Sequence, residues 1–449
     1  MSDMIKKGVH GCTKEERYVY PSDPVIRERL EWFRDKKLAF MMHFGPYSQM
    51  NGIDASWPLS EEDAEEREGV FWESDLDTFR QQYVGLNKSF NPVCVQPEKW
   101  AEFAAECGFK YLLFTTKHHD GFCMFDTKQT DYKITDPSCP FHTHKHANLT
   151  KAVFDAFRAK GLGIGAYFSK PDWHCPWYWT KDGEKAWGSD RNPTYDPKER
   201  PDLWSKFTEF THAQMTELIE EYGKIDILWL DGGQVKARNG QDIQLERFVE
   251  KARKIQPWLL TADRTVGGEY ENYITPEQSI PDHVIRVPWE SCVTLGKGWS
   301  HRYYDEYKST REIVRMLIEV VSHGGNLAIN VGPQPNGELP AEAQKVLRGL
   351  GEWLRVNGEA IYGTRADVGR VGNVMFTKKK ETRYAFLPLA EGEVLPGALR
   401  IPVEQKVSCV RVLGVDTPLD FACEDAEILL HLPVELQGTS PYAVVFALT

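Results

Sequence analysis

Seven short runs of hydrophobic residues occur between residues 37 and 333, and polar side chains follow most of them. The hydrophobic residues within a run are mostly continuous rather than alternating, as in "IDILWLDGG". Continuous runs of this length are typical of parallel strands that are buried on both faces of a sheet. The predicted strands span residues 37–45, 111–120, 164–174, 225–233, 258–264, 283–290 and 326–333.

Helical patterns lie between many of these runs. The stretch "NLTKAVFDAFRAKG" has hydrophobic residues at helical spacing and closes with a glycine, a common helix terminator. Alternation of strands and helices over this length predicts an α/β fold of the (β/α) TIM-like barrel type. Only seven of eight barrel strands are identified, so we expect the eighth to be short or the barrel to be irregular. A long acidic and aromatic insertion, residues 46–95, is expected to wall the active site.

The pattern changes beyond residue 362. The runs "VMFTKKKETRYAFLP", "GALRIPV", "VSCVRVLG" and "EILLHLP" are separated by turns, and no helical stretch lies between them. Short strands joined by turns are typical of an antiparallel β-sandwich. The sequence therefore predicts two domains: a barrel over residues 1–362 and a β-sandwich over residues 363–449.

Composition and charge exclude several classes of function. The chain of 449 residues carries a formal net charge of −12 without a long cluster of Lys and Arg, so no nucleic-acid partner is expected. No hydrophobic run approaches the ~20 residues of a membrane helix. The first residues lack the hydrophobic core of a secretory signal, which favours a cytoplasmic location unless a signal was trimmed from the chain. Nine scattered cysteines fit reduced thiols. The sequence does not determine the oligomeric state, and a homo-oligomer is compatible with it.

Chemically reactive side chains gather where the predicted strands end. In (β/α) barrels the reacting groups lie at the C-terminal ends of the strands. The residues at the C-terminal ends of the predicted strands are histidines, carboxylates, one arginine and aromatic residues. They are His43, His118, His119, Asp120, Tyr167, Asp172, Trp173, His174, Trp229, Asp231, Arg264, Trp289 and Glu290. The set contains neither a serine or cysteine elbow nor a phosphate-binding glycine loop.

These side chains are compatible with two kinds of site, a metal site and a sugar site. Imidazoles and carboxylates bind zinc, but adjacent residues of an extended segment point to opposite sides, so His118 and His119 should not share one ion. We therefore expect no metal and no cofactor. In a sugar site, by contrast, neutral histidines bind hydroxyl groups and indoles cover the apolar face of the ring. Asp231 closes its strand, two residues after Trp229 and before two glycines, which makes it the best candidate nucleophile of a glycosidase.

The chain resembles glycoside hydrolase family 29, the α-L-fucosidases, over about residues 38–363. The motifs that carry the resemblance are "HFGPYS", "TTKHHDGFCMFDT", "AYFSKPDW", "LWLDGG", "TPEQ", "PWESC" with "GWSHR", and "GGNLAINVGPQPNGELP". The resemblance implies an irregular barrel followed by a β-sandwich. It also implies metal-free, retaining, exo-acting hydrolysis of terminal α-L-fucosides, through a covalent fucosyl-enzyme, on fucosylated oligosaccharides or glycoconjugates.

The same resemblance assigns roles to individual residues. Asp231 matches the nucleophile of the family. The acid/base is open between Glu277, in "TPEQ", and Glu290, in "PWESC", with Glu277 preferred because that loop motif resembles the one that carries the acid in related enzymes. Fucose-binding roles fall on His43, Trp57, His118, His119, Tyr167, Trp229 and Arg264, and Trp299 fits a stacking position near the leaving group.

Three positions depart from the family pattern. Phe44 replaces a tryptophan, Ser56 replaces the glutamate before Trp57, and "GWSHR" replaces a Ser-Trp-Gly-Tyr motif. Asp54 is a candidate substitute for the missing glutamate. Three other functions stay open: a catalytically silent fucose-binding protein, an α-L-galactosidase-like enzyme whose substrate differs at C6, and a metal-dependent hydrolase on the same barrel.

Overall fold

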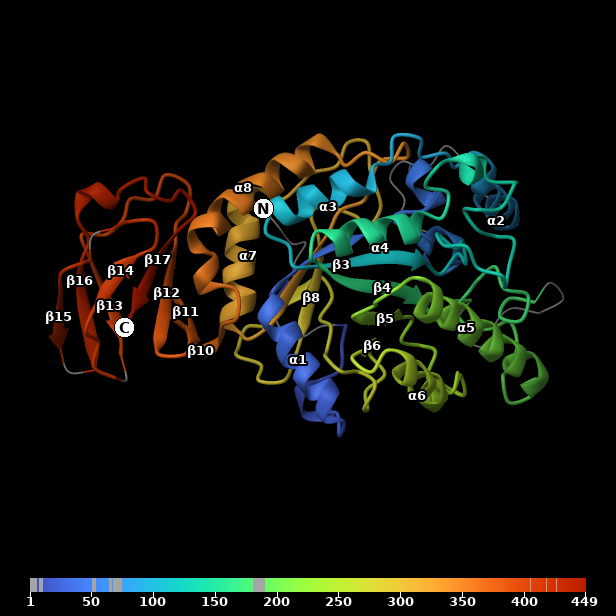
Figure 1. The fold of residues 1–449 in the computed structure, drawn as a ribbon, viewed down its shortest axis with the longest axis horizontal. Helices are drawn as coiled ribbons and strands as arrows, with labels where there is room; N and C mark the ends of the chain where they lie inside the picture. Colours follow the sequence, from blue (N-terminus) through green and yellow to red (C-terminus); the bar gives the residue numbers. More distant parts are fainter. Residues whose placement is uncertain are drawn as a thin grey trace.

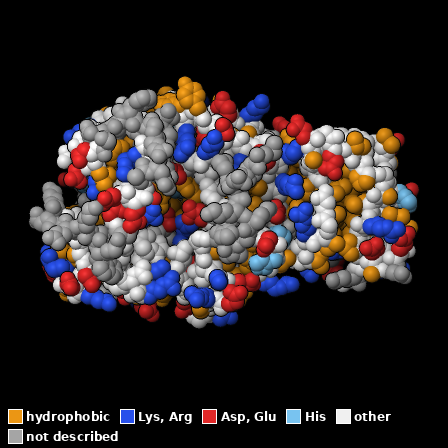
Figure 2. Space-filling view, turned by 180° about the vertical axis from the view of Figure 1, so that it is seen from behind, with side chains coloured by type: hydrophobic (Ala, Val, Ile, Leu, Met, Phe, Trp, Pro, Cys, Tyr) orange, Lys and Arg blue, Asp and Glu red, His pale blue; other side chains and the backbone are white. Residues whose placement is uncertain are grey.

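The computed structural model describes residues 6–7, 11–50, 54–63, 67, 75–180, 190–403, 405–416, 418–424 and 426–449. Part of the predicted insertion, residues 51–53, 64–66 and 68–74, therefore lies outside the described residues. No described helix combines the length and the hydrophobicity needed to cross a bilayer. On the face shown in Figure 2, positive and negative side chains are interspersed.

A curled sheet of seven parallel strands forms the centre of the molecule (Figure 1). The strand order is β6-β5-β4-β3-β2-β9-β8, and every pairing along it is parallel. The predicted α/β sheet is confirmed, because strands buried on both faces produce the continuous hydrophobic runs seen in the sequence. The strands are β2 (Leu38–Met42), β3 (Tyr111–Lys117), β4 (Gly163–Ser169), β5 (Ile227–Asp231), β6 (Leu260–Asp263), β8 (Glu290–Thr294) and β9 (Asn326–Asn330).

Helices connect these strands and cover the outside of the sheet (Figure 1). Their ends follow ordinary capping chemistry: the side chain of Asn148 caps α4, and Ser309 forms a capping box with Glu312 at the start of α7. The helices are α1 (Pro24–Lys36), α2 (Leu76–Val84), α3 (Pro97–Glu106), α4 (Leu149–Ala159), α5 (Pro201–Glu221), α6 (Leu245–Ile255), α7 (Thr310–Ser322) and α8 (Ala341–Asn357).

An irregular segment takes the place of the eighth strand. Residues 271–280 run between β6 and β8 and touch both neighbours through single bridges, Ala262 with Glu271 and Glu277 with Cys292. The segment ends in the two-residue strand β7 (Ser279–Ile280), which pairs with β1 (Lys6–Lys7) from the N-terminal segment. Among the described strands β6 and β8 are not paired, so the barrel is irregular, as the sequence predicts.

The sixth predicted strand is misplaced. Residues 283–288 form no strand, and β8 begins only at Glu290. Ile285 and Val287 are nevertheless buried, so their hydrophobic character reports burial rather than sheet pairing. Pro288 has no N–H to donate to a ladder, and the regular strand begins beyond it.

The C-terminal residues form two antiparallel sheets at one end of the molecule (Figure 1). They share a hydrophobic core, which confirms the predicted β-sandwich. Arg311 of α7 donates to the carbonyl oxygen of Leu389 at 2.7 Å, linking the sandwich to the barrel helices. A domain boundary at residue 363 remains our proposal. One sheet contains β10 (Arg365–Val371), β11 (Val374–Lys379), β12 (Thr382–Pro388), β17 (Ala443–Leu448) and β14 (Val410–Val412); the other contains β13 (Ala398–Pro402), β16 (Glu427–His431) and β15 (Phe421–Glu424).

Candidate active site

A cavity of about 170 Å³ opens at the C-terminal ends of the parallel strands. It is lined by ten of the eleven side chains to which the family resemblance assigns catalytic or sugar-binding roles, although they come from segments far apart in the chain. The ten are His43, Trp57, His118, His119, Tyr167, Trp229, Asp231, Arg264, Glu277 and Trp299; Glu290 is not among them.

Asp231 and Glu277 are joined by one arginine. Arg264 donates from Nη1 to Oδ1 of Asp231 and from Nη2 to Oε2 of Glu277, each at 2.6 Å. Tyr167 donates its hydroxyl proton to the other carboxylate oxygen of Asp231, also at 2.6 Å. Asp231 ends β5 and Arg264 follows β6, whereas Glu277 projects from the irregular segment. Two carboxylates from different elements thus face one small cavity.

The charge of Asp231 is stabilised by its neighbours. Burial alone would raise the pKa of this carboxyl, but Arg264, His119 and the hydroxyl of Tyr167 outweigh burial and hold the pKa well below its usual range. The carboxylate is therefore ionised at neutral pH, as a nucleophile requires. Glu277 is more exposed, with 39% of its side chain open to solvent, against 17% for Asp231.

Three histidines present one ring nitrogen each to the cavity because a neighbour holds the other. His43 Nδ1 lies 2.7 Å from Oδ1 of Asn330, an oxygen that also accepts from the His43 backbone N–H. An amide oxygen only accepts, so Nδ1 carries the proton and Nε2 of His43 is an acceptor. Ser56 Oγ binds Nδ1 of His118, and Ser169 Oγ binds Nδ1 of His119.

These histidines are neutral at physiological pH. Burial disfavours the charged ring and lowers the pKa of His43 and of His119 to about 4, and it lowers the pKa of His118 as well. Neutral imidazoles donate and accept hydrogen bonds at the same time, which suits adjacent sugar hydroxyls.

One expectation about the two adjacent histidines is wrong. Their rings do not point to opposite sides: the ring centres of His118 and His119 are 4.4 Å apart, and both rings line the cavity. They lie beyond the end of β3, where the alternation of an extended strand no longer holds. Ligand atoms of His118, His119 and Asp231 lie within 4.8 Å of one another, so the donor set fits a metal ion. Arg264 and Tyr167 already occupy the Asp231 carboxylate, however, and a metal-free site remains our prediction.

Aromatic rings form the floor and walls. Tyr167 stacks on Trp229 with ring centres 5.1 Å apart, and the Arg264 guanidinium lies 4.4 Å from the Trp229 ring centre. Trp57 meets the His119 ring edge-on at 4.9 Å. Trp299 lies 5.0 Å from the His43 ring. Apolar faces thus surround a polar centre, the arrangement expected for binding a carbohydrate ring.

Glu290 lies at the opposite end of the barrel from the cavity mouth. It begins β8 rather than ending a strand, and it is fully buried. Its carboxyl accepts from the hydroxyl of Tyr111 and, at 3.1 Å, from Nε1 of Trp229. Its position beneath Trp229 makes it a support for the floor of the cavity, and the geometry favours Glu277 as the residue that faces Asp231.

The environment of Glu290 predicts a measurable effect of pH on stability. Burial raises the pKa of Glu290 to about 7. Between pH ~4.5 and 7 the folded protein keeps a proton that the unfolded chain has released, so this group destabilises the fold progressively as pH rises through that window. The substitution Glu290→Gln removes the titration. We therefore compare the free energy of unfolding of the variant with that of the native protein. The difference, variant minus native, should increase by roughly 3 kcal/mol from pH 5 to pH 8.

Urea unfolding of both proteins at the two pH values measures this difference, in which the titration of all other groups cancels. The same pH dependence in both proteins would show that Glu290 ionises normally.

The departures from the family motifs have structural consequences. Ser56 takes no position in the cavity wall; its hydroxyl binds His118 and accepts from the backbone N–H of Asp120. Asp54, the candidate substitute for the missing glutamate, does not line the cavity either; its carboxylate accepts from the backbone N–H of Trp299 at 2.6 Å. Phe44 packs against Phe90 in the core.

No pattern in the sequence indicated that the N-terminal segment reaches the site. Gly11 lines the cavity, and a Cβ at this position would lie 3.6 Å from Cβ of Glu277. Thr13 donates its hydroxyl proton to Glu271 at 2.6 Å, which ties the segment to the connection that leads to Glu277. The segment has no hydrophobic pattern, so its docking could not be seen from sequence periodicity.

Comparisons with known proteins point to one family. A family model described as Alpha-L-fucosidase matches residues 9–359. Plasma alpha-L-fucosidase of Rattus norvegicus is 27% identical over 372 residues, covering 79% of this chain and 76% of the relative. Alpha-L-fucosidase of Branchiostoma floridae is 25% identical over 455 residues, covering 95% and 94%.

Solved structures show the same similarity over almost the whole chain. Alpha-L-fucosidase isoenzyme 1 from Paenibacillus thiaminolyticus superimposes with a TM-score of 0.78 at 28% identity, covering 95% of this chain and 99% of that structure. The alpha-fucosidase of Thermotoga maritima in complex with a mechanism based inhibitor gives a TM-score of 0.75 at 25% identity, covering 96% and 100%.

Proposed function

Because this chain belongs to the α-L-fucosidase family of glycoside hydrolases, we propose that it removes terminal α-L-fucose from oligosaccharides or glycoconjugates with retention of configuration. Asp231 is the nucleophile and Glu277 the acid/base. The observation that carries the proposal is the bridging arginine: Arg264 holds both carboxylates at 2.6 Å and so keeps them at the same cavity. Retaining enzymes need their two carboxyl groups only ~5–5.5 Å apart.

In the first step a carboxylate oxygen of Asp231 attacks the anomeric carbon of fucose. The bond to the leaving-group oxygen breaks, and the carboxyl of Glu277 gives that oxygen its proton. In the second step Glu277, now a carboxylate, takes a proton from water while the water oxygen attacks the anomeric carbon and releases Asp231. Two inversions leave fucose in its original α configuration. The mechanism-based inhibitor bound by the Thermotoga maritima relative supports a covalent intermediate.

The walls of the cavity explain why a terminal fucose is the proposed substrate. Its volume of about 170 Å³ is well below the ~300–1,000 Å³ of sites for drug-sized ligands, so it holds a single sugar residue. Nε2 of His43 accepts a hydroxyl proton, and His118 and His119 supply further hydrogen-bonding groups. The indoles of Trp57, Trp229 and Trp299 offer apolar faces to the ring carbons and the C6 methyl group.

Hydrolysis of an aryl α-L-fucoside tests this function. We expect turnover with α-L-fucose as the first product seen by proton NMR, and at least tenfold lower kcat/KM on the matched aryl α-L-galactoside, which carries one extra hydroxyl at C6. Equal rates would favour the α-L-galactosidase-like alternative. Fucose binding without turnover would favour a silent binding protein, and β-fucose as first product would exclude retention.

A further inference from the structure

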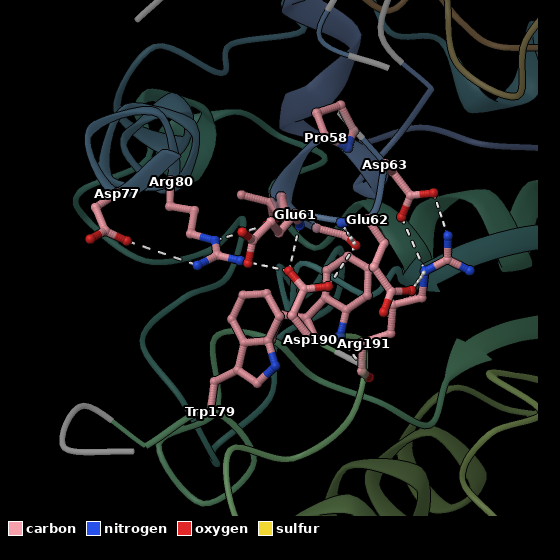
Figure 3. Close-up of polar contacts among 12 residues, drawn as sticks. Pro58, Glu61, Glu62, Asp63, Asp77, Arg80, Trp179, Asp190 and Arg191 are labelled. Atoms are coloured by element: carbon pink, nitrogen blue, oxygen red, sulfur yellow. Dashed lines mark hydrogen bonds and ion pairs between the residues drawn. The ribbon is translucent and has the colours of Figure 1, made fainter. Parts of the chain in front are cut away.

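Trp57 stands on a short segment whose neighbouring residues Pro58 and Leu59 are buried. It begins the one-turn helix Trp57–Leu59, and its ring is partly exposed at the rim of the cavity. The segment faces residues 190 and 191 of the long connection between β4 and α5, and these two residues hold it in place (Figure 3).

Asp190 binds the segment beyond Trp57 through its carboxylate. One oxygen accepts from the hydroxyl of Ser60 at 2.8 Å, and the other accepts from the backbone N–H of Glu61 and from Nη2 of Arg80 at 2.9 Å (Figure 3). Arg80, from α2, also donates to the carbonyl oxygen of Leu59 at 2.8 Å. Only 16% of the Asp190 side chain is exposed, so these contacts are largely shielded from water.

Arg191 binds the same segment from the other side. Its guanidinium forms a two-pronged pair with the carboxylate of Asp63, through Nη2 and, at 3.1 Å, through Nε (Figure 3). The same guanidinium lies 4.7 Å from the ring centre of Trp57. A planar cation over an indole is attracted by the ring face, and the pair with Asp63 fixes where that cation lies. Arg191 does not line the cavity itself.

From these contacts we propose that Asp190 and Arg191 form a rim clasp that positions Trp57 as a wall of the sugar cavity. The inference rests on the proposed fucosidase function. Arg191 is a positioning residue: it acts on the substrate only through the indole of Trp57. Losing it should weaken substrate binding and leave the chemistry at Asp231 and Glu277 largely unchanged.

The test is steady-state kinetics of Arg191→Gln on an aryl α-L-fucoside. We expect KM to rise about fivefold, from the combined loss of a cation–π contact and a partly shielded ion pair, while kcat changes less than twofold. In the Trp57→Ala background the same substitution should have no further effect on KM, because its target is gone. A purely structural role would not give this dependence on Trp57.

Three controls make the result decisive. Arg200→Gln removes an arginine of the same connection that pairs with the exposed Asp202, and it should leave KM unchanged. Arg191→Lys keeps the charge without the planar fork and serves if the Gln variant folds poorly, as judged by Tm. Asp63→Asn should raise KM in the same direction.

An unchanged KM in both Arg191 variants, or an equal rise in KM in the presence and absence of Trp57, would overturn the clasp while leaving the fucosidase proposal intact. A native protein without fucosidase activity would overturn both proposals, so the two failures are distinguishable.

Discussion

Replacing Asp231 with asparagine is expected to lower kcat for an aryl α-L-fucoside about 10⁴-fold, equivalent to roughly 5 kcal/mol of transition-state stabilisation. The amide has nearly the same shape as the carboxylate, but it cannot form the glycosyl ester. It also cannot carry the negative charge that Arg264 and Tyr167 now stabilise. Binding of free fucose should weaken far less, because the histidines and indoles that line the cavity remain.

Asp226, a second aspartate in the sequence run that contains β5, provides a matched control. Asp226 precedes β5 at the opposite end from Asp231, where it pairs with Arg29 at 2.7 Å and accepts from the backbone N–H of Ile164. Asp226→Asn should lower Tm through the loss of this buried pair, yet leave kcat within a few-fold of the native value. If Asp231→Asn retains kcat within tenfold of native while still binding fucose, Asp231 is not the nucleophile.

Truncation of the acid/base is the second large effect. Glu277→Ala should reduce kcat/KM on natural fucosides by about 10²–10⁴-fold, since their poor leaving groups need the proton. Aryl fucosides with good leaving groups need little protonation and should suffer much less in the first step. The covalent intermediate should then accumulate and be intercepted by added azide.

The configuration of the azide product identifies the residue that was removed. In Glu277→Ala, azide attacks the intermediate from the face that the leaving group vacated and should yield α-fucosyl azide. In Asp231→Ala, azide takes the place of the missing nucleophile and should yield β-fucosyl azide.

Glu290→Ala provides the comparison between the two candidate glutamates. Its carboxyl supports Trp229 from below, so its loss should lower stability and raise KM, and azide should not restore its rate. Azide rescue of Glu290→Ala, without rescue of Glu277→Ala, would reverse the assignment.

Much of the fold could be predicted because burial leaves a direct mark on the sequence. The central strands other than β8 lie where continuous hydrophobic runs occur, since both faces of a parallel sheet are covered. The same logic placed His43, His118 and Asp231 together, because the C-terminal ends of parallel strands meet at one edge. The strand predicted at residues 283–290 was wrong for the same reason. Ile285 and Val287 are buried in an irregular connection, and burial alone does not distinguish a strand from a covered loop.

The fold class, the family and the residue types at the strand ends could all be predicted from the sequence, because they depend on local hydrophobic pattern and on motifs contiguous in the chain. The three-dimensional packing was needed to see which glutamate shares a cavity with Asp231 and which residues contact the segment of Trp57. Glu277 stands on a segment without a regular strand, and Arg191 and Asp63 are separated by more than a hundred positions. Such contacts depend on how distant segments pack against one another, and no short-range pattern in the sequence records that packing.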